Sequence, residues 1–531
     1  MFTKRHVLAG LLCLLLFASA CGPSARKNEP VATEAPISGV PATEPPALEF
    51  PALPAGQNPH PPVPTMGVVP NHKDREPYDM FYEDYGVNPS IDTDDDNLST
   101  FALDVDTGSY TIMRNYLSEG NLPPGDSVRV EEYVNYFEQD YPIPPEHQTF
   151  TISVDGAPSP FTLTERYQMI RIGIQGYQVP ERERKDANLV FVIDVSGSMN
   201  MDNRLGLVKR SLELLVEQLR RTDTVSIVVY GTNAHLILEP TSGSEKGEIL
   251  RAINRLQPEG VTNAEAGIRL GYRTAMRAYI PNGINRVILC SDGVANMGQI
   301  ESDVILSEVH GYVEEGVNLA TFGFGMDNYN DTLMEQLADN GDGTYAYIDD
   351  LDEARRLFID KLTSTLQTIA MDARVQVEFD PDVVMRYRLV GFENRAIADE
   401  DFRDNQVDAG EIGAGHSVTA LYEIKLFPEA YGRIATVYLR WQDPDLRQVV
   451  ELSKDFTTEE MAYRFEDASP YFQRAVVVAE YAEILKESYW AEENSFSDVY
   501  REAQRIAELL YHDEAMQEFV DLVHKAMHLW E

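Results

Sequence analysis

Three oxygen-bearing side chains at alternate positions follow an apolar run near the middle of the chain. The run Leu189–Ile193 is uninterrupted, as in a central parallel strand that is buried on both faces. Asp194, Ser196 and Ser198 come directly after it. In a doubly wound sheet, the loops at the carboxyl ends of the strands line the crevice where ligands bind. Hydroxyl and water oxygens suit a hard octahedral cation such as Mg²⁺, so these residue types are compatible with a cation site. Asp194 and Ser196 alone would also suit a strand-end turn and a helix cap.

Two further oxygen-bearing residues occur at suitable points along the chain. Thr262, within Gly260-Val261-Thr262-Asn263, opens a predicted helix after a turn. Asp292, within Ser291-Asp292-Gly293, follows the predicted strand Arg286–Cys290. With these pieces in place, the pattern resembles the metal-ion-dependent adhesion site of von Willebrand factor type A (VWA) domains.

The resemblance implies a role for each of the five residues. Ser196 and Ser198 would ligate the metal directly, and Thr262 would do so directly or through water. Asp194 and Asp292 would hold coordinated waters further out. The implied ion is Mg²⁺, with Mn²⁺ or Ca²⁺ as alternatives. Because the hydroxyl ligands are neutral, positive field remains at the open position, which favours a carboxylate from a partner protein over a hydrolytic water.

The elements that would position these residues alternate between strands and helices over residues 187–369. Predicted strands near 224–230, 286–290, 317–324 and 345–348 are separated by amphipathic helices, and a long helix over 351–369 closes the unit. This alternation predicts an α/β fold with a doubly wound, Rossmann-like sheet, which we assign to the VWA domain.

The segments on either side are rich in predicted strands. Residues 98–182 suggest a small mixed α/β module, residues 373–456 an antiparallel β module, and residues 457–531 a C-terminal helical region. We expect the two β-rich flanks to pack together, with the VWA domain inserted between them. The arrangement is similar to a family of bacterial lipoproteins that carry a VWA domain between two extra conserved regions. The signatures are Leu98-Ser99-Thr100-Phe101, Val225-Ser226-Ile227-Val228-Val229-Tyr230 and Gly413-Ala414-Gly415-His416-Ser417.

The N-terminus has the layout of a secretory signal followed by a lipid attachment site. Lys4 and Arg5 precede an apolar run that is too short to span a bilayer. Ala18-Ser19-Ala20-Cys21 resembles a bacterial lipobox, which implies removal of residues 1–20 and lipidation of Cys21. The Pro-rich composition of residues 21–90 predicts a disordered tether. We therefore expect a protein of the bacterial cell envelope, held by its lipid on the extracytoplasmic side of a membrane.

Composition excludes several classes of function. The chain has 531 residues, with 44 Lys and Arg against 87 Asp and Glu, and a net charge of −43. Such a surface repels nucleic acids and anionic headgroups. The cysteines are Cys13, Cys21 and Cys290, which exclude a disulfide framework and a Cys-ligated zinc site.

These observations favour a non-enzymatic protein that binds an acidic side chain of a protein ligand through the metal. A competing hypothesis is a phosphatase-like enzyme, because Asp104-Val105-Asp106-Thr107 resembles the nucleophile motif of haloacid-dehalogenase-type phosphatases. Too few residues precede the next domain to hold that fold. Two further hypotheses are a structural envelope component and a chaperone-like subunit working with an ATPase, and the leader argues against the second of these.

Overall fold

The computed structural model describes residues 80–530 except for 104–105, 163–165, 294–298 and 326–328. The predicted signal peptide, Cys21 and the tether as far as residue 79 therefore lie outside the described residues, as does Asp104. Within the described ranges, none of the helices combines the length and the apolar character needed to cross a bilayer.

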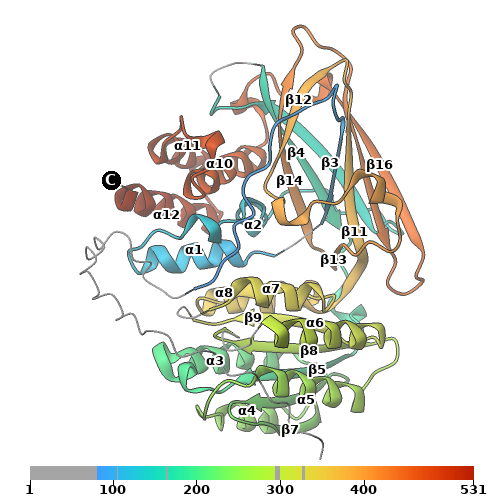
Figure 1. The fold of residues 1–531 in the computed structure, drawn as a ribbon, viewed down its shortest axis with the longest axis vertical. Coiled ribbons are helices and arrows are strands. Elements are labelled where there is room, and N and C mark those ends of the chain that lie inside the picture. The colour runs from blue at the N-terminus through green and yellow to red at the C-terminus, as the bar shows by residue number, and fades with distance from the viewer. Residues whose placement is uncertain (1–79, 104–105, 163–165, 294–298, 326–328, 531) are drawn as a thin grey trace, which may run out of the picture. The chain divides into compact units, whose positions relative to one another are not determined.

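A six-stranded sheet organises residues 187–366, here called the α/β domain (Figure 1). The strand order is β10-β9-β8-β5-β6-β7, and every neighbouring pair is parallel except β6 and β7. The strands are β5 (Ala187–Asp194), β6 (Thr224–Tyr230), β7 (Ala234–Ser242), β8 (Ile284–Ser291), β9 (Asn318–Gly323) and β10 (Tyr345–Tyr347). The helices are α3 (Arg204–Gln218), α4 (Lys246–Asn254), α5 (Ala264–Arg277), α6 (Gln299–Glu314), α7 (Asp331–Asp339), α8 (Leu351–Arg355) and α9 (Leu362–Leu366).

Helices cover both faces of this sheet, which confirms the predicted doubly wound fold. Along β5, Leu189 and Phe191 pack in one apolar core with α3, α4, α8 and α9. Val190 and Val192 point to the other face and pack with α5, α6 and α7. The uninterrupted apolar run thus reflects burial on both sides of the strand. Cys290 on β8 is fully buried and free.

The predicted helix over 351–369 is wrong as a continuous element. Its turns are α8, a π-helical turn over Arg356–Asp360, and α9, and strand β11 begins at Thr368. Of the predicted apolar stripe Leu351, Ala354, Phe358 and Leu362, the last three are buried in the core, whereas Leu351 is 37% exposed. The i, i+4 spacing of these buried residues suits an α turn and a π turn alike, so periodicity alone does not separate the two.

Two antiparallel sheets form the flanking module. The first has the order β1-β12-β14-β4-β3; the second has the order β13-β11-β15-β16, and β2 also pairs with β11. Their strands are β1 (Ile91–Asp92), β2 (Leu98–Ala102), β3 (Phe150–Pro158), β4 (Tyr167–Gly176), β11 (Thr368–Phe379), β12 (Val384–Val390), β13 (Gly410–Gly413), β14 (Ser417–Leu426), β15 (Arg433–Gln442) and β16 (Val449–Thr457). Ile172 of β4 faces Ala420 of β14, and Thr100 of β2 faces Gln376 of β11. Strands from both sides of the α/β domain thus share sheets, which confirms that the flanks form one β-rich module.

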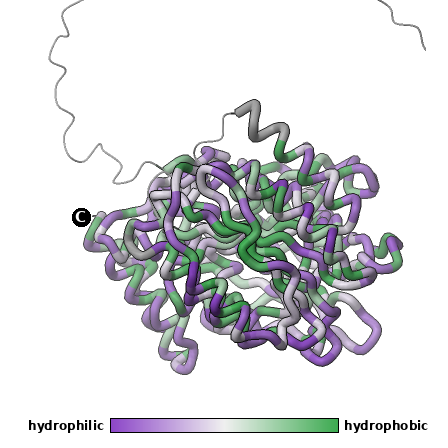
Figure 2. Tube along the Cα trace, turned by 90° about the horizontal axis from the view of Figure 1, so that it is seen from below, coloured by the Kyte–Doolittle hydropathy of each residue, from purple (hydrophilic) through white to green (hydrophobic). Residues whose placement is uncertain are grey.

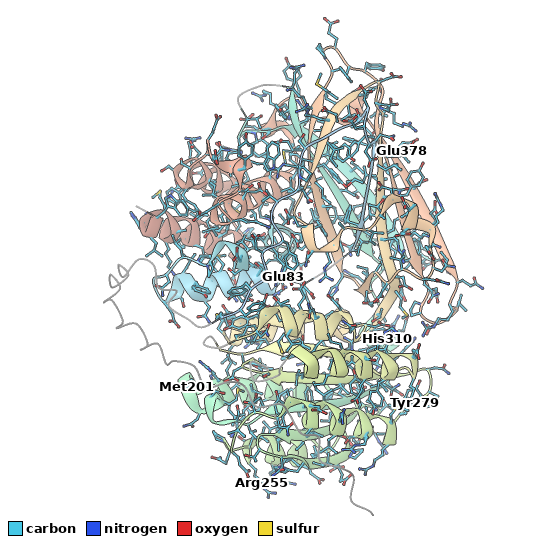
Figure 3. All side chains as sticks on the ribbon, viewed as in Figure 1. Glu83, Met201, Arg255, Tyr279, His310 and Glu378 are labelled. Atoms are coloured by element: carbon cyan, nitrogen blue, oxygen red, sulfur yellow. The ribbon has the colours of Figure 1, made fainter. Side chains whose placement is uncertain are left out.

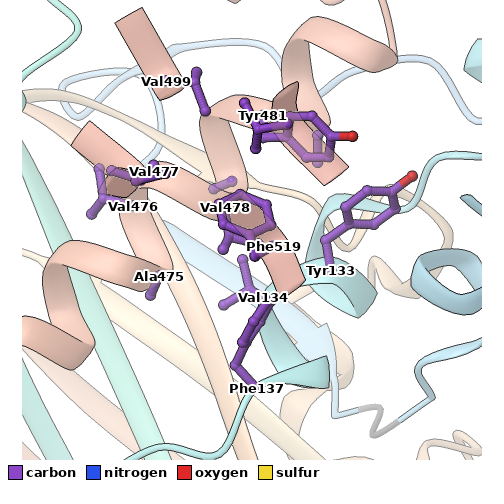
Figure 4. Packing of buried hydrophobic residues seen from close by; sticks show 14 of the residues in the cluster. Tyr133, Val134, Phe137, Ala475, Val476, Val477, Val478, Tyr481, Val499 and Phe519 are labelled. Atoms are coloured by element: carbon purple, nitrogen blue, oxygen red, sulfur yellow. The ribbon is translucent and has the colours of Figure 1, made fainter. Parts of the chain in front are cut away.

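A layer of helices lies beside the outer face of the first sheet. They are α1 (Gly108–Ser118), α2 (Val130–Tyr136), α10 (Pro470–Leu485), α11 (Phe496–Leu509) and α12 (Glu514–Trp530), of which α2 and α10 contact the sheet directly. Met169 of β4 and Leu421 of β14 pack in their apolar core, part of which is drawn in Figure 4. The opposite face of the same sheet packs on the second sheet through residues such as Ile172 and Val375. Figure 2 accordingly shows apolar segments in the interior and hydrophilic ones outside.

Buried ion pairs join the flanking module to the α/β domain. Arg114 of α1 contacts Asp349 at 2.6 Å, and Arg129 contacts Asp331 of α7 at 2.7 Å. Residues 80–90 also belong to the folded part, since Asn88 Nδ2 donates to the Gly391 carbonyl at 2.7 Å. The predicted end of the tether at residue 90 is therefore too late.

Candidate metal centre

Two neighbouring strands place carboxylates at the same edge of the α/β sheet. β5 ends at Asp194, and the parallel strand beside it, β8, ends at Ser291, so that Asp292 follows directly. Both Asp194 and Asp292 are buried. The Ser291 hydroxyl donates to Asp194 Oδ2 at 3.2 Å, which links the two strand ends.

The loop after β5 brings two hydroxyls to the Asp194 carboxylate. Asp194 Oδ1 accepts a hydrogen bond from the backbone N–H of Ser196 at 2.7 Å, which folds the loop back over the strand end. The hydroxyl oxygens of Ser196 and Ser198 lie 3.0 Å apart. Ser196 is buried, Ser198 is half-buried and Gly197 is exposed, so Ser198 is the more accessible of the two serines. Met201, labelled in Figure 3, follows this loop and is 46% exposed.

The segment that carries Thr262 lies against this loop. Gly197 N–H donates to the Gly260 carbonyl at 3.1 Å, and Glu259 N–H donates to the Val195 carbonyl. Gly260 has φ +76, and a Cβ there would lie 2.1 Å from the Thr232 hydroxyl, so glycine is required for this close approach. Thr262 is half-buried and stands just before α5, whose N-cap is Asn263. The structure therefore brings together the loops that bear all five predicted residues.

Burial and charge raise the pKa of the Asp194 carboxyl. Its removal from water is the larger cause and the charge of Asp292 is the second, and together they raise the pKa to about 6. Arg204 Nη1 donates to Asp292 Oδ2 at 2.9 Å, and both side chains are buried. Arg204 thus offsets one of the two carboxylates, and a divalent cation would meet an incompletely neutralised anionic site.

The sequence patterns missed two residues of this arrangement. Arg204 opens α3 six residues after Ser198, and no spacing rule links a helix-start arginine to a carboxylate 88 positions later. Ser291 stands directly before Asp292 at the end of β8, so its position at a predicted strand end was the signal that could have found it.

A second acidic group lies elsewhere in the chain. One carboxylate oxygen from each of Asp342, Asp408 and Glu411 lies within 4.8 Å of the others. Burial, and then the charge of Asp408, raise the pKa of Asp342 to about 7. Asp342 precedes β10, so it lies at the amino end of the parallel strands, opposite the edge that carries Asp194.

Asp106 is the one aspartate of the phosphatase-like motif that the structure describes, and it contacts residues of two other segments. Asp106 is buried, and its Oδ1 accepts a hydrogen bond from the Tyr345 backbone at 3.0 Å. Arg395 lies 3.8 Å from its other oxygen. These contacts join the flanking module to β10.

Residues 188–361 match the family model described as von Willebrand factor type A domain. The chain carries a VWA domain. Two further models match outside it: "Uncharacterized protein YfbK, C-terminal" at residues 364–431 and 428–529, and "von Willebrand factor" at residues 76–171. The family models thus match residues in both flanks as well as in the VWA domain.

The proteins that resemble the chain include two curated bacterial proteins and one solved structure. The uncharacterized protein YfbK of Escherichia coli is 40% identical over 389 residues, which cover 72% of this chain and 66% of YfbK. The uncharacterized protein sll0103 of Synechocystis is 27% identical over 36% of this chain and 44% of its own length. The chain thus spans less than two thirds of either relative. A structure described as von Willebrand factor type A from Catenulispora acidiphila has a TM-score of 0.43 and 15% identity, over 72% of this chain and 90% of its own.

Proposed function

We propose that this protein is a non-enzymatic binding protein whose VWA domain takes an acidic side chain of a protein ligand through a Mg²⁺ ion. The ion would lie at the carboxyl end of β5. The residues that would hold it are Asp194, Ser196, Ser198, Thr262 and Asp292. VWA domains generally mediate protein interactions, and this supports a protein as the ligand.

The separation of the two serine hydroxyls carries the proposal. Mg²⁺ binds oxygen ligands at about 2.0–2.1 Å with octahedral geometry, so two neighbouring ligands lie about 2.9 Å apart. The Ser196 and Ser198 hydroxyl oxygens are 3.0 Å apart, beside a buried carboxylate. This distance supports a pair of adjacent ligands on one ion.

The charge balance favours a carboxylate as the incoming ligand. The serine hydroxyls carry no charge, and Arg204 offsets Asp292. Asp194 alone would not neutralise a divalent ion, so the open coordination position would attract an anion. A glutamate or aspartate side chain of a partner supplies one charged oxygen and fits that position.

We also propose that the protein acts in the bacterial cell envelope, attached by a lipid on Cys21. Support comes from the small-residue segment Ala18–Ala20 before this cysteine and from the Pro-rich segment that follows. A tether of that composition would let the folded part reach ligands at a distance from the membrane.

The first test is Mg²⁺ binding by isothermal titration calorimetry on the full chain. Ser198→Ala removes one ligand, and we expect at least a tenfold loss of affinity. Ser244→Ala is the matched control, because the Ser242 and Ser244 hydroxyls also lie 3.0 Å apart but form an exposed pair in a turn after β7. Equal affinity in wild type and Ser198→Ala would contradict the proposed site.

The second test is ligand capture from native membranes by crosslinking, with Mg²⁺ and then with EDTA. We expect capture to fall with chelator and with Ser198→Ala, and to survive Ser244→Ala. Capture that is indifferent to both, in a protein that Mg²⁺ nevertheless stabilises, would favour a structural envelope component. Turnover of a phosphoester that is lost in Asp106→Asn would favour an enzyme.

A further inference from the structure

A pair of histidines lies on the exposed face of the last helix. The buried face of α12 packs against α10 and α11 through Met516, Phe519, Leu522, Val523 and Ala526. His524 and His528 are one helical turn apart on the opposite, exposed face. Their Nε2 atoms lie 3.1 Å apart.

This separation fits two ligands of one transition metal. With metal–nitrogen bonds of about 2.0–2.1 Å, two imidazoles lie about 3.3 Å apart in a tetrahedral site and about 2.9 Å apart in a tetragonal one. The observed 3.1 Å lies between these values. Imidazole nitrogen is a ligand for Zn²⁺, Cu²⁺ and Ni²⁺, whereas Mg²⁺ prefers oxygen.

Packing between α11 and α12 holds one of the two rings. The His524 ring packs against Tyr500 of α11, with centroids 5.2 Å apart. The Ser497 hydroxyl of α11 donates to Met527 Sδ at 3.5 Å, which contributes a second contact between the same helices. The rings of His524 and His528 are nearly perpendicular, at 83°. A metal would therefore meet His524 in a position that packing already favours, which reduces the entropy lost on binding.

Charges of both signs lie near the pair. The net charge of the chain is −43, Asp521 is exposed three residues before His524, and Lys525 is exposed three residues before His528. Residues three apart lie on the same side of a helix. Among the described residues, only Asp342, Asp408 and Glu411 form a group of three or more possible metal ligands within 4.8 Å of one another. No third ligand of this kind lies beside the described histidines, so they would act as a pair. The remaining coordination positions would be open to water or to a ligand from another molecule.

We propose that His524 and His528 chelate a transition-metal dication, Zn²⁺, Cu²⁺ or Ni²⁺, through their Nε2 atoms. This site is separate from the proposed Mg²⁺ site in residues, ligand chemistry and domain. The competing explanation is a hydrogen bond between two neutral rings, for which 3.1 Å is also suitable.

The test is Zn²⁺ titration of the full chain, purified without a polyhistidine tag, in excess Mg²⁺. We expect His524→Gln and His528→Gln each to weaken Zn²⁺ binding at least tenfold, since removing even an indirect partner of a metal typically costs about 10–100-fold. His512→Gln is the matched control, because His512 is exposed in the connection between α11 and α12. The group at Asp342 is intact in all three variants, so any Zn²⁺ that it binds is common to them.

A spectroscopic measurement identifies the ligands directly. Electron paramagnetic resonance of the Cu²⁺-loaded chain should show coupling to two imidazole nitrogens, reduced to one in His528→Gln. Absence of Zn²⁺ binding in wild type, or equal Zn²⁺ affinity in wild type and both histidine variants, would overturn the proposal and leave a hydrogen bond only. An equal loss of affinity in His512→Gln would also overturn it.

Discussion

Replacing Asp194 by asparagine should stabilise the metal-free protein while destroying its response to Mg²⁺. Asp194 is fully buried, and burial with the charge of Asp292 raises its pKa from the ordinary 3.8 to about 6. An acid whose pKa is higher in the folded state than in the unfolded state binds protons more tightly when folded. Its contribution to stability is therefore greatest at low pH and is lost as the pH rises from about 4 to about 6.

The magnitude follows from the two pKa values. At about 1.36 kcal/mol per pH unit, the difference between 3.8 and about 6 corresponds to about 3 kcal/mol of unfolding free energy. Asparagine keeps the shape and an acceptor for the Ser196 N–H but carries no charge. Without metal at pH 7.5, we expect Asp194→Asn to be more stable than wild type by about 1–3 kcal/mol, with the advantage vanishing near pH 4.

Urea unfolding in EDTA over a series of pH values provides the assay. The difference in unfolding free energy between variant and wild type isolates Asp194, because the other buried carboxyl groups are common to both. Saturating Mg²⁺ should reverse the order, since ligand binding stabilises only the protein that binds it.

Asp223→Asn is the matched control, because Asp223 is equally buried but has the opposite pKa shift. Burial alone would raise the Asp223 pKa, but the Arg184 guanidinium and backbone donors outweigh it and lower the pKa. Asp223→Asn should therefore destabilise the protein at pH 7.5 with and without Mg²⁺. If Asp194→Asn destabilises the metal-free protein at pH 7.5, or if its effect does not change between pH 4 and pH 7.5, the reasoning is refuted.

Three other substitutions have definite expected outcomes. Arg204→Gln leaves the buried Asp292 without its cation and should lower the unfolding free energy by about 3–5 kcal/mol. Mg²⁺ should restore part of this in thermal unfolding, and equal losses with Mg²⁺ and EDTA would contradict the account. Arg129→Met breaks the buried ion pair with Asp331 and should also lower the unfolding free energy, measured with urea, by about 3–5 kcal/mol. A loss below about 1 kcal/mol would mean that this contact does not hold the flanking module to the VWA domain. Cys21→Ser should move the protein from the membrane fraction to the soluble fraction or leave an unprocessed precursor, and unchanged fractionation would exclude the lipid anchor.

Local sequence patterns were sufficient to predict helices that are buried on one side and strands that are buried on both faces. The run Leu189–Ile193 is buried on both faces as β5, and the stripe at Leu205, Val208 and Leu212 forms the buried side of α3. Helix α1 was missed for a physical reason. Ile112 and Tyr116 pack on the VWA domain, whereas Tyr110, Met113 and Leu117 pack with the C-terminal helices. A helix buried on opposite sides has no single apolar stripe for periodicity to detect.

The sequence by itself predicted the doubly wound α/β fold and the strand end that carries Asp194, through local periodicity and the rule that ligands bind at the carboxyl ends of parallel strands. The assignment to the VWA domain and the five residues proposed to hold Mg²⁺ came from resemblance to that family's motif. Only the tertiary structure decided that Arg204 offsets Asp292, and which strands pair within the β-rich module that the two flanks were predicted to form. It also decided that the His524 and His528 rings approach to 3.1 Å. Pairing between strands some 250 residues apart and the choice of side-chain rotamers depend on packing across the whole fold, which no local pattern encodes.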